Sequence, residues 1–323
     1  MLRTPSPTRP RSLDDLLDAQ LATRIEGLDL SSRKIFAGRL KGERRSKKRG
    51  ESVEFADHRP YVAGDDLRFI DWNIYGRLDR LFLKLFQEEE DLSLHVVLDA
   101  SASMDCGEPG KFAYAQRVTA SLAYIGLVNL NRVSLTMLAG KESEENAGNE
   151  GQQAAQTIAR PTQTLRNLRG RRRARDMGDW LCAAAPAGAT DFGAAARRIA
   201  LSRQGKGVMV VLSDFFFKEG YETGLRMLIG RGYDVFCVQL LSPQELEPAI
   251  GGDVRLRDIE DGDTAEVTIT APLLAQYKAT LGAYTEQFRL FCAARDIAMM
   301  TISTATPVET VLLEYFRSRG LLR

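Results

Sequence analysis

The sequence has 323 residues, of which 44% are hydrophobic, a composition typical of a globular protein with a sizeable core. Lys plus Arg (44) nearly equals Asp plus Glu (43), so the overall charge does not indicate a polyanionic partner. The cysteines show no CxxC or paired spacing, which favours reduced thiols in a cytoplasmic protein over a disulfide framework. They are Cys106, Cys182, Cys237 and Cys292.

The first residues, MLRTPSPTRPRSLDDLLD, contain no apolar run of the kind found in a secretory signal. No window of the sequence approaches the roughly 20 apolar residues that a membrane-spanning helix requires. We therefore expect a cytoplasmic protein without a membrane span.

Residues 1–50 are predicted to form a basic N-terminal arm. Residues 1–12 are rich in Pro, Ser and Arg, which is typical of disorder. The stretch LDDLLDAQLATRIEGLDL has leucines near helical spacing and predicts one short amphipathic helix. The basic run that includes Arg44–Arg49 has no interleaved aromatics in its densest part, so a solvated surface is favoured over a nucleic-acid site.

Residues 51–92 alternate charged and aromatic side chains, and RLFLKLFQ predicts a strand by its period of two. Within GDDLRFIDW, pairing of Arg68 or Arg77 with Asp66 or Asp71 would form an ion-pair and turn network that holds this segment to the sheet. That role is favoured over a catalytic one, because the segment offers no nucleophile–base pair.

Residues 93–323 alternate predicted strands and helices, which indicates a doubly wound α/β domain. The strands beginning at Leu94, Val208 and Val235 are nearly continuous apolar runs, as expected when helices cover both faces of a parallel sheet. The Arg-rich stretch RNLRGRRRARD favours a solvated helix face over a binding site for an acidic partner. The predicted strands are LHVVLD, RVSLTML, QTIARP, GVMVVLSD, DVFCVQLL, AEVTIT and AMMTIST, and the predicted helices span 111–129, 192–203, 222–231 and 272–295.

Short oxygen-bearing side chains gather where the predicted parallel strands end. In LHVVLDASASM, Asp99 ends a strand and Ser101 and Ser103 follow it; Asp214 ends a second strand. Ligands of open α/β sheets gather at the carboxyl ends of the strands. Oxygen-only ligands suit Mg²⁺, or Mn²⁺, and do not suit Zn²⁺. Either Thr190 or its neighbour Asp191, just before a predicted helix, is a further candidate ligand of the metal.

The combination of DASAS with a later Thr and a strand-ending Asp resembles the metal-ion-dependent adhesion site of von Willebrand factor A domains. The resemblance implies a three-layer αβα, Rossmann-like sheet, here with an N-terminal appendage. It implies that Ser101, Ser103 and Thr190 approach the metal and that Asp99 and Asp214 act directly or through water. The open coordination position would accept an acidic residue of a protein partner.

The stretch from Gly50 to Met104 resembles the bacterial family known as domain of unknown function 58, as does the C-terminal VETVLLEYFRSRGLL. This resemblance implies association with MoxR-type AAA+ ATPases. The residues that carry it are Glu54, Phe55, Asp57, Arg59, Tyr61, Gly64, Asp65, Asp66, Arg68, Ile70, Asp71, Trp72 and Arg77.

Motifs of several enzyme classes are missing from the sequence. CGEPGKF lacks the GxxxxGK[ST] spacing of a phosphate-binding loop, and there is no GxSxG nucleophile elbow. We therefore expect a non-enzymatic, Mg²⁺-dependent protein-binding module that works with a MoxR-type ATPase or its client. A metal-dependent phosphoester hydrolase using the same oxygens is the alternative. Nucleic-acid binding through the Arg-rich stretches is a third possibility.

Overall fold

We describe a computed structural model of residues 9–32, 54–87, 92–139, 141–142, 158–159, 162–202, 207–260 and 262–323. The chain divides into two compact units. Met1–Ala37 and Leu92–Arg323 form the sheet unit, and Gly38–Asp91 form the inserted unit. The sequence predicted boundaries near residues 50 and 92, with the N-terminal arm separate from the α/β domain; the structure instead joins the N-terminal residues to the sheet unit. The basic run Arg44–Arg49 lies outside the described residues.

The sheet unit contains a six-stranded, mostly parallel sheet. Five strands are parallel, and the edge strand β7 runs antiparallel to β4. The predicted α/β architecture is confirmed at this level. In spatial order the strands are β12 (Ala298–Ser303), β9 (Asp234–Leu241), β8 (Gly207–Ser213), β3 (Ser93–Ala100), β4 (Arg132–Ala139) and β7 (Gln163–Leu168).

Two predicted strands lie outside this sheet. AEVTIT contains β11 (Thr264–Ile269), which pairs with β10 (Gly252–Arg257) in a separate hairpin. The predicted strand QTIARP contains β6 (Ile158–Ala159), which among the described residues pairs with β5 (Lys141–Glu142) in a separate two-stranded sheet. The edge position is taken by β7, whose polar, mostly exposed sequence gave no strand signal.

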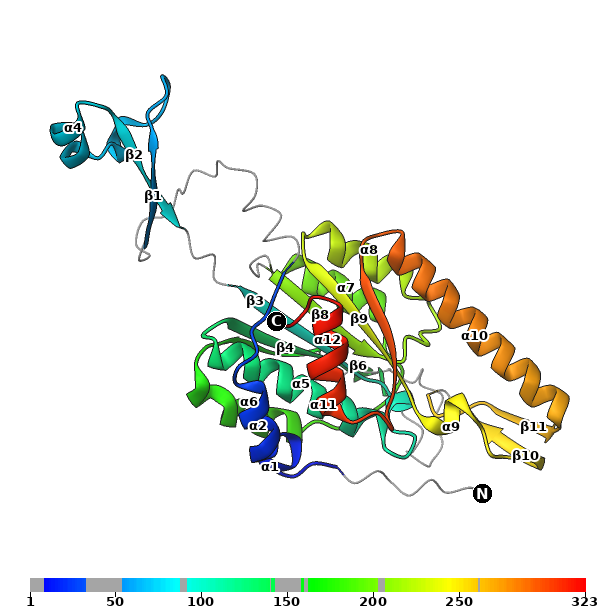
Figure 1. The fold of residues 1–323 in the computed structure, drawn as a ribbon. Helices are drawn as coiled ribbons and strands as arrows, with labels where there is room; N and C mark the ends of the chain where they lie inside the picture. The colour runs from blue at the N-terminus through cyan, green and yellow to red at the C-terminus, as the bar shows by residue number, and fades with distance from the viewer. Residues whose placement is uncertain are drawn as a thin grey trace. The chain divides into compact units, whose positions relative to one another are not determined.

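Helices cover both faces of the sheet (Figure 1). The hydrophobic core divides accordingly into two clusters, one on each face. The first cluster includes residues of α1 (Leu13–Leu16), α2 (Ala19–Ile25), α5 (Lys111–Val128), α6 (Ala174–Cys182), α11 (Val308–Thr310), η4 (Val311–Tyr315) and α12 (Phe316–Ser318). The second includes residues of α7 (Phe192–Leu201), α8 (Glu222–Gly230) and α10 (Ala271–Ala293). Short elements η2 (Ala102–Met104), η3 (Arg171–Arg173) and α9 (Pro243–Leu246) lie between the larger ones.

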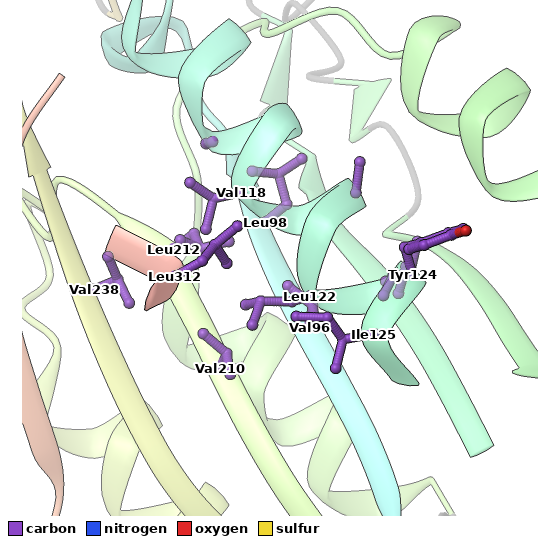
Figure 2. Packing of buried hydrophobic residues seen from close by; sticks show 14 of the residues in the cluster. Val96, Leu98, Val118, Leu122, Tyr124, Ile125, Val210, Leu212, Val238 and Leu312 are labelled. Atoms are coloured by element: carbon purple, nitrogen blue, oxygen red, sulfur yellow. The ribbon is translucent and has the colours of Figure 1, made fainter. Parts of the chain in front are cut away.

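The central strands are buried on both faces, which explains their continuous apolar sequences. In β3, Val96 and Leu98 face the α5 side, whereas Val97 belongs to the opposite cluster. Each fully buried Val or Leu side chain contributes about 1.5–3 kcal/mol relative to an exposed one. Figure 2 shows the packing on the α5 side, where Val118, Leu122 and Ile125 meet Val96, Leu98, Val210 and Leu212.

The N-terminal segment is part of the core of the sheet unit. The sequence predicted one amphipathic helix, whereas the structure has two, α1 capped by Ser12 and α2 capped by Asp18. Leu16, Leu21 and Ile25 are almost completely buried in the first cluster. The predicted disorder of residues 1–12 falls mostly outside the described residues.

The inserted unit pairs β1 (Glu54–Pro60) with β2 (Phe82–Gln87) and carries η1 (Leu67–Phe69) and α4 (Trp72–Leu78). One predicted ion pair is present, between Arg68 and Asp66 at 2.6 Å. Asp71 caps α4 and pairs with His58 and Lys84 rather than with an arginine. The hydrogen bond from His58 is the main cause that lowers the pKa of Asp71 to about 2. These contacts close turns within the inserted unit itself.

Two observations bear on the predicted environment of the protein. None of the four cysteines is in a disulfide. In the part of the chain that the structure describes, no helix is both long enough and apolar enough to cross a bilayer.

Gly207 provides a test of the sheet register, because it pairs with Ser93 across β8 and β3. A Cβ atom at Gly207 would lie 2.0 Å from the backbone oxygen of Ser93. We expect Gly207→Ala to lower the free energy of unfolding by roughly 2 kcal/mol or more, measured by urea denaturation. The matched change Gly230→Ala in α8 meets no atom within 4 Å and should raise stability by up to about 1 kcal/mol. Equal effects of the two substitutions would contradict the register.

His95 provides a test of the buried edge between β3, β4 and β7. Its Nε2 lies 2.7 Å from Thr136 Oγ1, whose hydroxyl in turn lies 3.2 Å from Thr164 Oγ1. Burial, and secondarily the charge of Arg166, lowers the pKa of His95 from 6.5 to about 4. Between these values the unfolded chain binds a proton that the folded protein does not, so stability is lost as the pH falls from about 6.5 toward 4.

We expect the wild type to lose about 2 kcal/mol more unfolding free energy between pH 7 and pH 4.5 than His95→Gln does. Urea denaturation of both proteins at the two pH values measures the difference. An identical pH dependence would show that His95 is not kept neutral by its surroundings.

Candidate metal site

Asp99 and Asp214 are brought together by neighbouring parallel strands. β3 pairs with β8 so that Leu98 lies opposite Leu212, and the two aspartates follow at the same edge of the sheet. Both side chains are buried, at 0% and 2% exposure. Both aspartates thus lie at the ends of neighbouring parallel strands, which is the location that the sequence predicted.

Hydrogen bonds from three sides fix the carboxylate of Asp99. Oδ1 accepts the backbone N–H of Ser101 at 3.0 Å and the hydroxyl of Thr190 at 3.2 Å. Oδ2 accepts the hydroxyl of Ser213 at 2.6 Å. Both oxygens are thus held in place by donors from three different segments.

Ser101 and Ser103 direct their hydroxyls toward each other, with the two Oγ atoms 2.8 Å apart. Mg²⁺ takes an octahedral shell of oxygens at about 2.1 Å, which puts neighbouring ligands about 3 Å from each other. The two hydroxyls share a hydrogen bond, and the same spacing is compatible with adjacent ligands of one magnesium ion.

Thr190, rather than Asp191, reaches the site. Backbone hydrogen bonds from Ala187 to Ala100 (2.9 Å) and from Ala102 to Gly188 (2.8 Å) hold the segment before Thr190 against the end of β3. The carboxylate of Asp191 instead accepts the N–H of Ala194 and caps α7. Of the two candidates left open by the sequence, only Thr190 contacts Asp99 among the hydrogen bonds of the described residues.

Lys111, the first residue of α5, occupies the other side of Asp214. Its ammonium donates to Asp214 Oδ2 at 2.9 Å and to Glu245 Oε1 at 2.6 Å, and the lysine is 1% exposed. Burial lowers the pKa of Lys111, but the two carboxylates outweigh it and raise the pKa well above its usual value. Asp214 Oδ1 accepts the N–H of Phe216 at 3.1 Å, so both of its oxygens have a partner within the chain.

Asp99 has no such counter-charge. Within the described ranges, no Lys or Arg side chain pairs with it. Burial, with the nearby charge of Asp214 as the second cause, raises the pKa of Asp99 to about 6. A buried carboxylate without a cationic partner is costly, and a bound cation would relieve that cost.

The donor set fits a magnesium ion. It consists of the two aspartates and the hydroxyls of Ser101, Ser103 and Thr190, all hard oxygens. The carboxylates of Asp99, Asp214 and Glu245 outnumber the single ammonium of Lys111, so a bound cation would reduce an excess of negative charge. No three His, Cys, Asp or Glu side chains of the described residues converge as metal ligands, so hydroxyl, backbone or water oxygens would have to complete any such site.

Comparison with known protein families shows which family the chain belongs to. The family described as "Protein of unknown function DUF58" matches residues 57–286, more than half of the sequence. The chain belongs to the DUF58 family. The match starts in the inserted unit and extends to α10, so it includes all five predicted site residues of this DUF58 protein.

Its curated relatives carry no assigned activity. Uncharacterized proteins of Mycobacterium bovis and Mycobacterium tuberculosis are each 25% identical over 287 residues, which are 87% of this chain and 85% of theirs. An uncharacterized protein of Mycobacterium avium is 28% identical over 106 residues, 33% of this chain and 57% of that protein.

Among solved structures, the DUF58 chain is similar to the conserved hypothetical protein BatB from Bacteroides thetaiotaomicron. The identity is 15% and the TM-score 0.41, over 71% of this chain and 98% of that one. The pilus adhesin SpaC from Lactobacillus rhamnosus GG gives 12% identity and a TM-score of 0.40 in its open conformation, over 73% of this chain and 31% of that one.

The sequence did not identify Lys111, Glu245 or Ser213 as part of the site. Ser213 directly precedes Asp214 and could have been found as another hydroxyl at the end of the strand. Lys111 and Glu245 lie 103 and 31 residues from Asp214, and only the fold brings them to it. Glu245 had one local signal, the Ser-Pro-Gln-Glu capping box that begins α9.

Removing the ammonium of Lys111 tests the charge balance of the site. We expect Lys111→Met to lower the free energy of unfolding by about 3–5 kcal/mol, because it leaves Asp214 and Glu245 unpaired beside a second buried carboxylate. Urea denaturation at neutral pH measures the loss. The control Lys278→Met removes an exposed lysine 4.0 Å from Glu247 and should change stability by no more than about 0.5 kcal/mol. A loss as small as that of the control would contradict the pairing.

Proposed function

We propose that this DUF58 protein contains a von Willebrand factor A-like domain that binds Mg²⁺ at the carboxyl edge of its sheet. Asp99, Ser101, Ser103, Thr190 and Asp214 would hold the ion, and the ion would bind an acidic side chain of a protein partner. The protein would act as a non-enzymatic, cytoplasmic adaptor or assembly factor.

The observation that carries the proposal is the gathering of the other four residues near Asp99, a buried carboxylate without a cationic partner in the described residues. The spacing of Ser101 and Ser103 is compatible with adjacent magnesium ligands. Asp214, whose two oxygens accept bonds from Lys111 and Phe216, suits contact through an intervening water better than direct ligation.

The bound cation would supply an electrophilic position for one further oxygen ligand. The protein would do the rest with its own side chains. Thr190 and Ser213 orient the carboxylate of Asp99, and Lys111 neutralises Asp214. With few direct protein ligands, Mg²⁺ retains exchangeable positions that an outside carboxylate can take.

The choice of partner rests on the family resemblance alone. The DUF58 resemblance implies a MoxR-type AAA+ ATPase, or the client that it remodels, as the protein whose acidic side chain is bound. Fold-level similarity does not define a partner, so this part of the proposal needs its own test.

Metal binding is tested by thermal unfolding of the full chain with and without Mg²⁺. Since a ligand that binds only the folded state stabilises it by about 2.7 kcal/mol at 100 times its dissociation constant, we expect the wild-type Tm to rise with Mg²⁺. Asp99→Asn should abolish the rise. Asp191→Asn is the matched control, because Asn still caps α7 and the residue lies outside the ligand set, and its Tm should rise as in the wild type. If the Tm of the wild type does not change when Mg²⁺ is added, the proposed metal site is wrong.

Partner binding is tested with purified MoxR-type ATPase from the same cells and immobilised DUF58 protein. Retention by the wild type in Mg²⁺, and loss in EDTA or with Asp99→Asn, is the expected result. Retention under all conditions would place the interface elsewhere. Turnover of a phosphoester that depends on Asp99 would instead favour the hydrolase alternative.

A further inference from the structure

One face of the edge strand β7 carries polar side chains. Thr162, Thr164 and Arg166 occupy every second position, so their side chains point to the same side of the sheet. Thr164 pairs with Thr136 of β4, whose register partner on β3 is Val97. Because Val97 belongs to the core cluster on the α7 side, these polar side chains face α7.

The last turn of α7 forms a pocket with this face of the sheet. Ser202 follows Arg198 by four residues and Ile199 by three, so the three side chains lie together at the end of the helix. In the part of the chain that the structure describes, the pocket is lined by two guanidinium groups, four hydroxyls, one apolar side chain and no carboxylate. Its volume is about 130 Å³, and its lining residues are Thr136, Thr162, Thr164, Arg166, Arg198, Ile199 and Ser202.

The two arginines of the pocket have no acidic partner. Arg166 and Arg198 are exposed, and neither forms an ion pair within the described residues. By contrast, Arg171 of the same Arg-rich stretch pairs with Glu26. Two guanidinium groups that line one pocket without a counter-ion favour the binding of an anion between them.

A chain of hydroxyls leads from the pocket into the core. Thr164 Oγ1 lies 3.2 Å from Thr136 Oγ1, which lies 2.7 Å from Nε2 of His95. Thr136 and His95 are each only 1% exposed. Nδ1 of His95 has no hydrogen-bond partner among the described residues, so within them Thr136 is the polar contact of the ring. The environment of His95 therefore depends on what Thr136 and Thr164 bind.

We propose that this pocket binds a phosphate group, either as inorganic phosphate or as the end of a small phosphate monoester. The guanidinium groups of Arg166 and Arg198 would pair with its oxygens, as their planar forks suit phosphate. Together with the hydroxyls of Thr162 and Thr164 they offer more donors than a carboxylate accepts. Ligand pockets for larger molecules have about 300–1,000 Å³, so this one admits a single phosphate group rather than a whole nucleotide.

The hydroxyl chain has a consistent direction when phosphate is bound. With the proton of His95 on Nε2, the ring donates to Thr136, Thr136 donates to Thr164, and Thr164 donates to the anion. Each hydroxyl then accepts one hydrogen bond and donates one. The bound anion thereby reaches a buried histidine through two side chains.

The end of α7 does not prevent anion binding, although the C-terminus of a helix carries a partial negative charge. The N–H of Ser202 donates to the backbone oxygens of Arg198 and Ile199, each at 3.1 Å, and its hydroxyl donates to the oxygen of Ile199 at 2.6 Å. These carbonyl groups are thus engaged within the helix end, and the two arginines supply the positive charge of the pocket.

The test uses inorganic phosphate and glycerol phosphate as probes with the full chain, at constant pH and ionic strength. Calorimetry gives the Kd. Nuclear magnetic resonance of the histidine ring nitrogens reports the hydroxyl chain, because His58 and His95 are the two histidines of the sequence. His58 belongs to the inserted unit and does not line the pocket, so its signal serves as the internal reference.

We expect phosphate to shift the signal of His95 along the same saturation curve that calorimetry gives, with His58 unchanged. Arg166→Gln and Arg198→Gln should each bind about tenfold or more weakly, because each loses a charge-assisted hydrogen bond. The matched control Arg197→Gln removes an exposed arginine of α7 that does not line the pocket and should bind as the wild type does.

Two results would overturn the proposal. One is a His95 signal that does not respond to either probe, and the other is equal binding by the three arginine variants, which would indicate general attraction of anions to the surface. Tighter binding of glycerol phosphate than of inorganic phosphate would identify a monoester as the ligand. Binding of inorganic phosphate alone would identify the free ion.

Discussion

Two carboxylates buried side by side, Asp99 of β3 and Asp214 after β8, are the constraint around which the carboxyl edge of the sheet is organised. Like charges in a poorly solvated site repel each other, so each needs its own compensation. Asp214 obtains it from the ammonium of Lys111. Asp99 receives neutral donors from Ser101, Thr190 and Ser213, which orient it without neutralising it. This asymmetry is why a cation is expected beside Asp99.

Lys111, which neutralises Asp214, also pairs with Glu245, and Glu245 links separate parts of the fold. Glu245 accepts Lys111 through Oε1, while its Oε2 accepts the N–H of Ser242 in the capping box of α9. The hydroxyl of Tyr277 in α10 donates to the backbone oxygen of Glu245 at 3.0 Å. Through its carboxylate and its backbone oxygen, Glu245 thus contacts the start of α5, the short helix that leads into the β10–β11 hairpin, and α10.

The parts that could be predicted from the sequence were those with a local signal. Continuous apolar runs identified β3, β8 and β9, and the rule that ligands gather at strand ends located Asp99, Ser101, Ser103 and Asp214. The edge strand β7 gave no signal, because one edge pairing leaves its side chains exposed and polar. Burial of α1 and α2 depends on a core assembled from distant residues, as does the meeting of Lys111 with Glu245, 134 positions away. No periodicity encodes such contacts.

The pairing of residues 29–31 with 321–323 has a consequence for how the protein is made. Asp29 and Arg323 exchange both backbone hydrogen bonds, at 3.1 and 3.0 Å, and Ser31 donates to the backbone oxygen of Leu321. During translation, the early segment must remain without this partner until nearly all of the sheet unit has left the ribosome. The inserted unit, contained within Gly38–Asp91, can form its own β1–β2 pairing long before that. The inserted unit can therefore be complete before the sheet unit, whose two segments precede and follow it in the sequence.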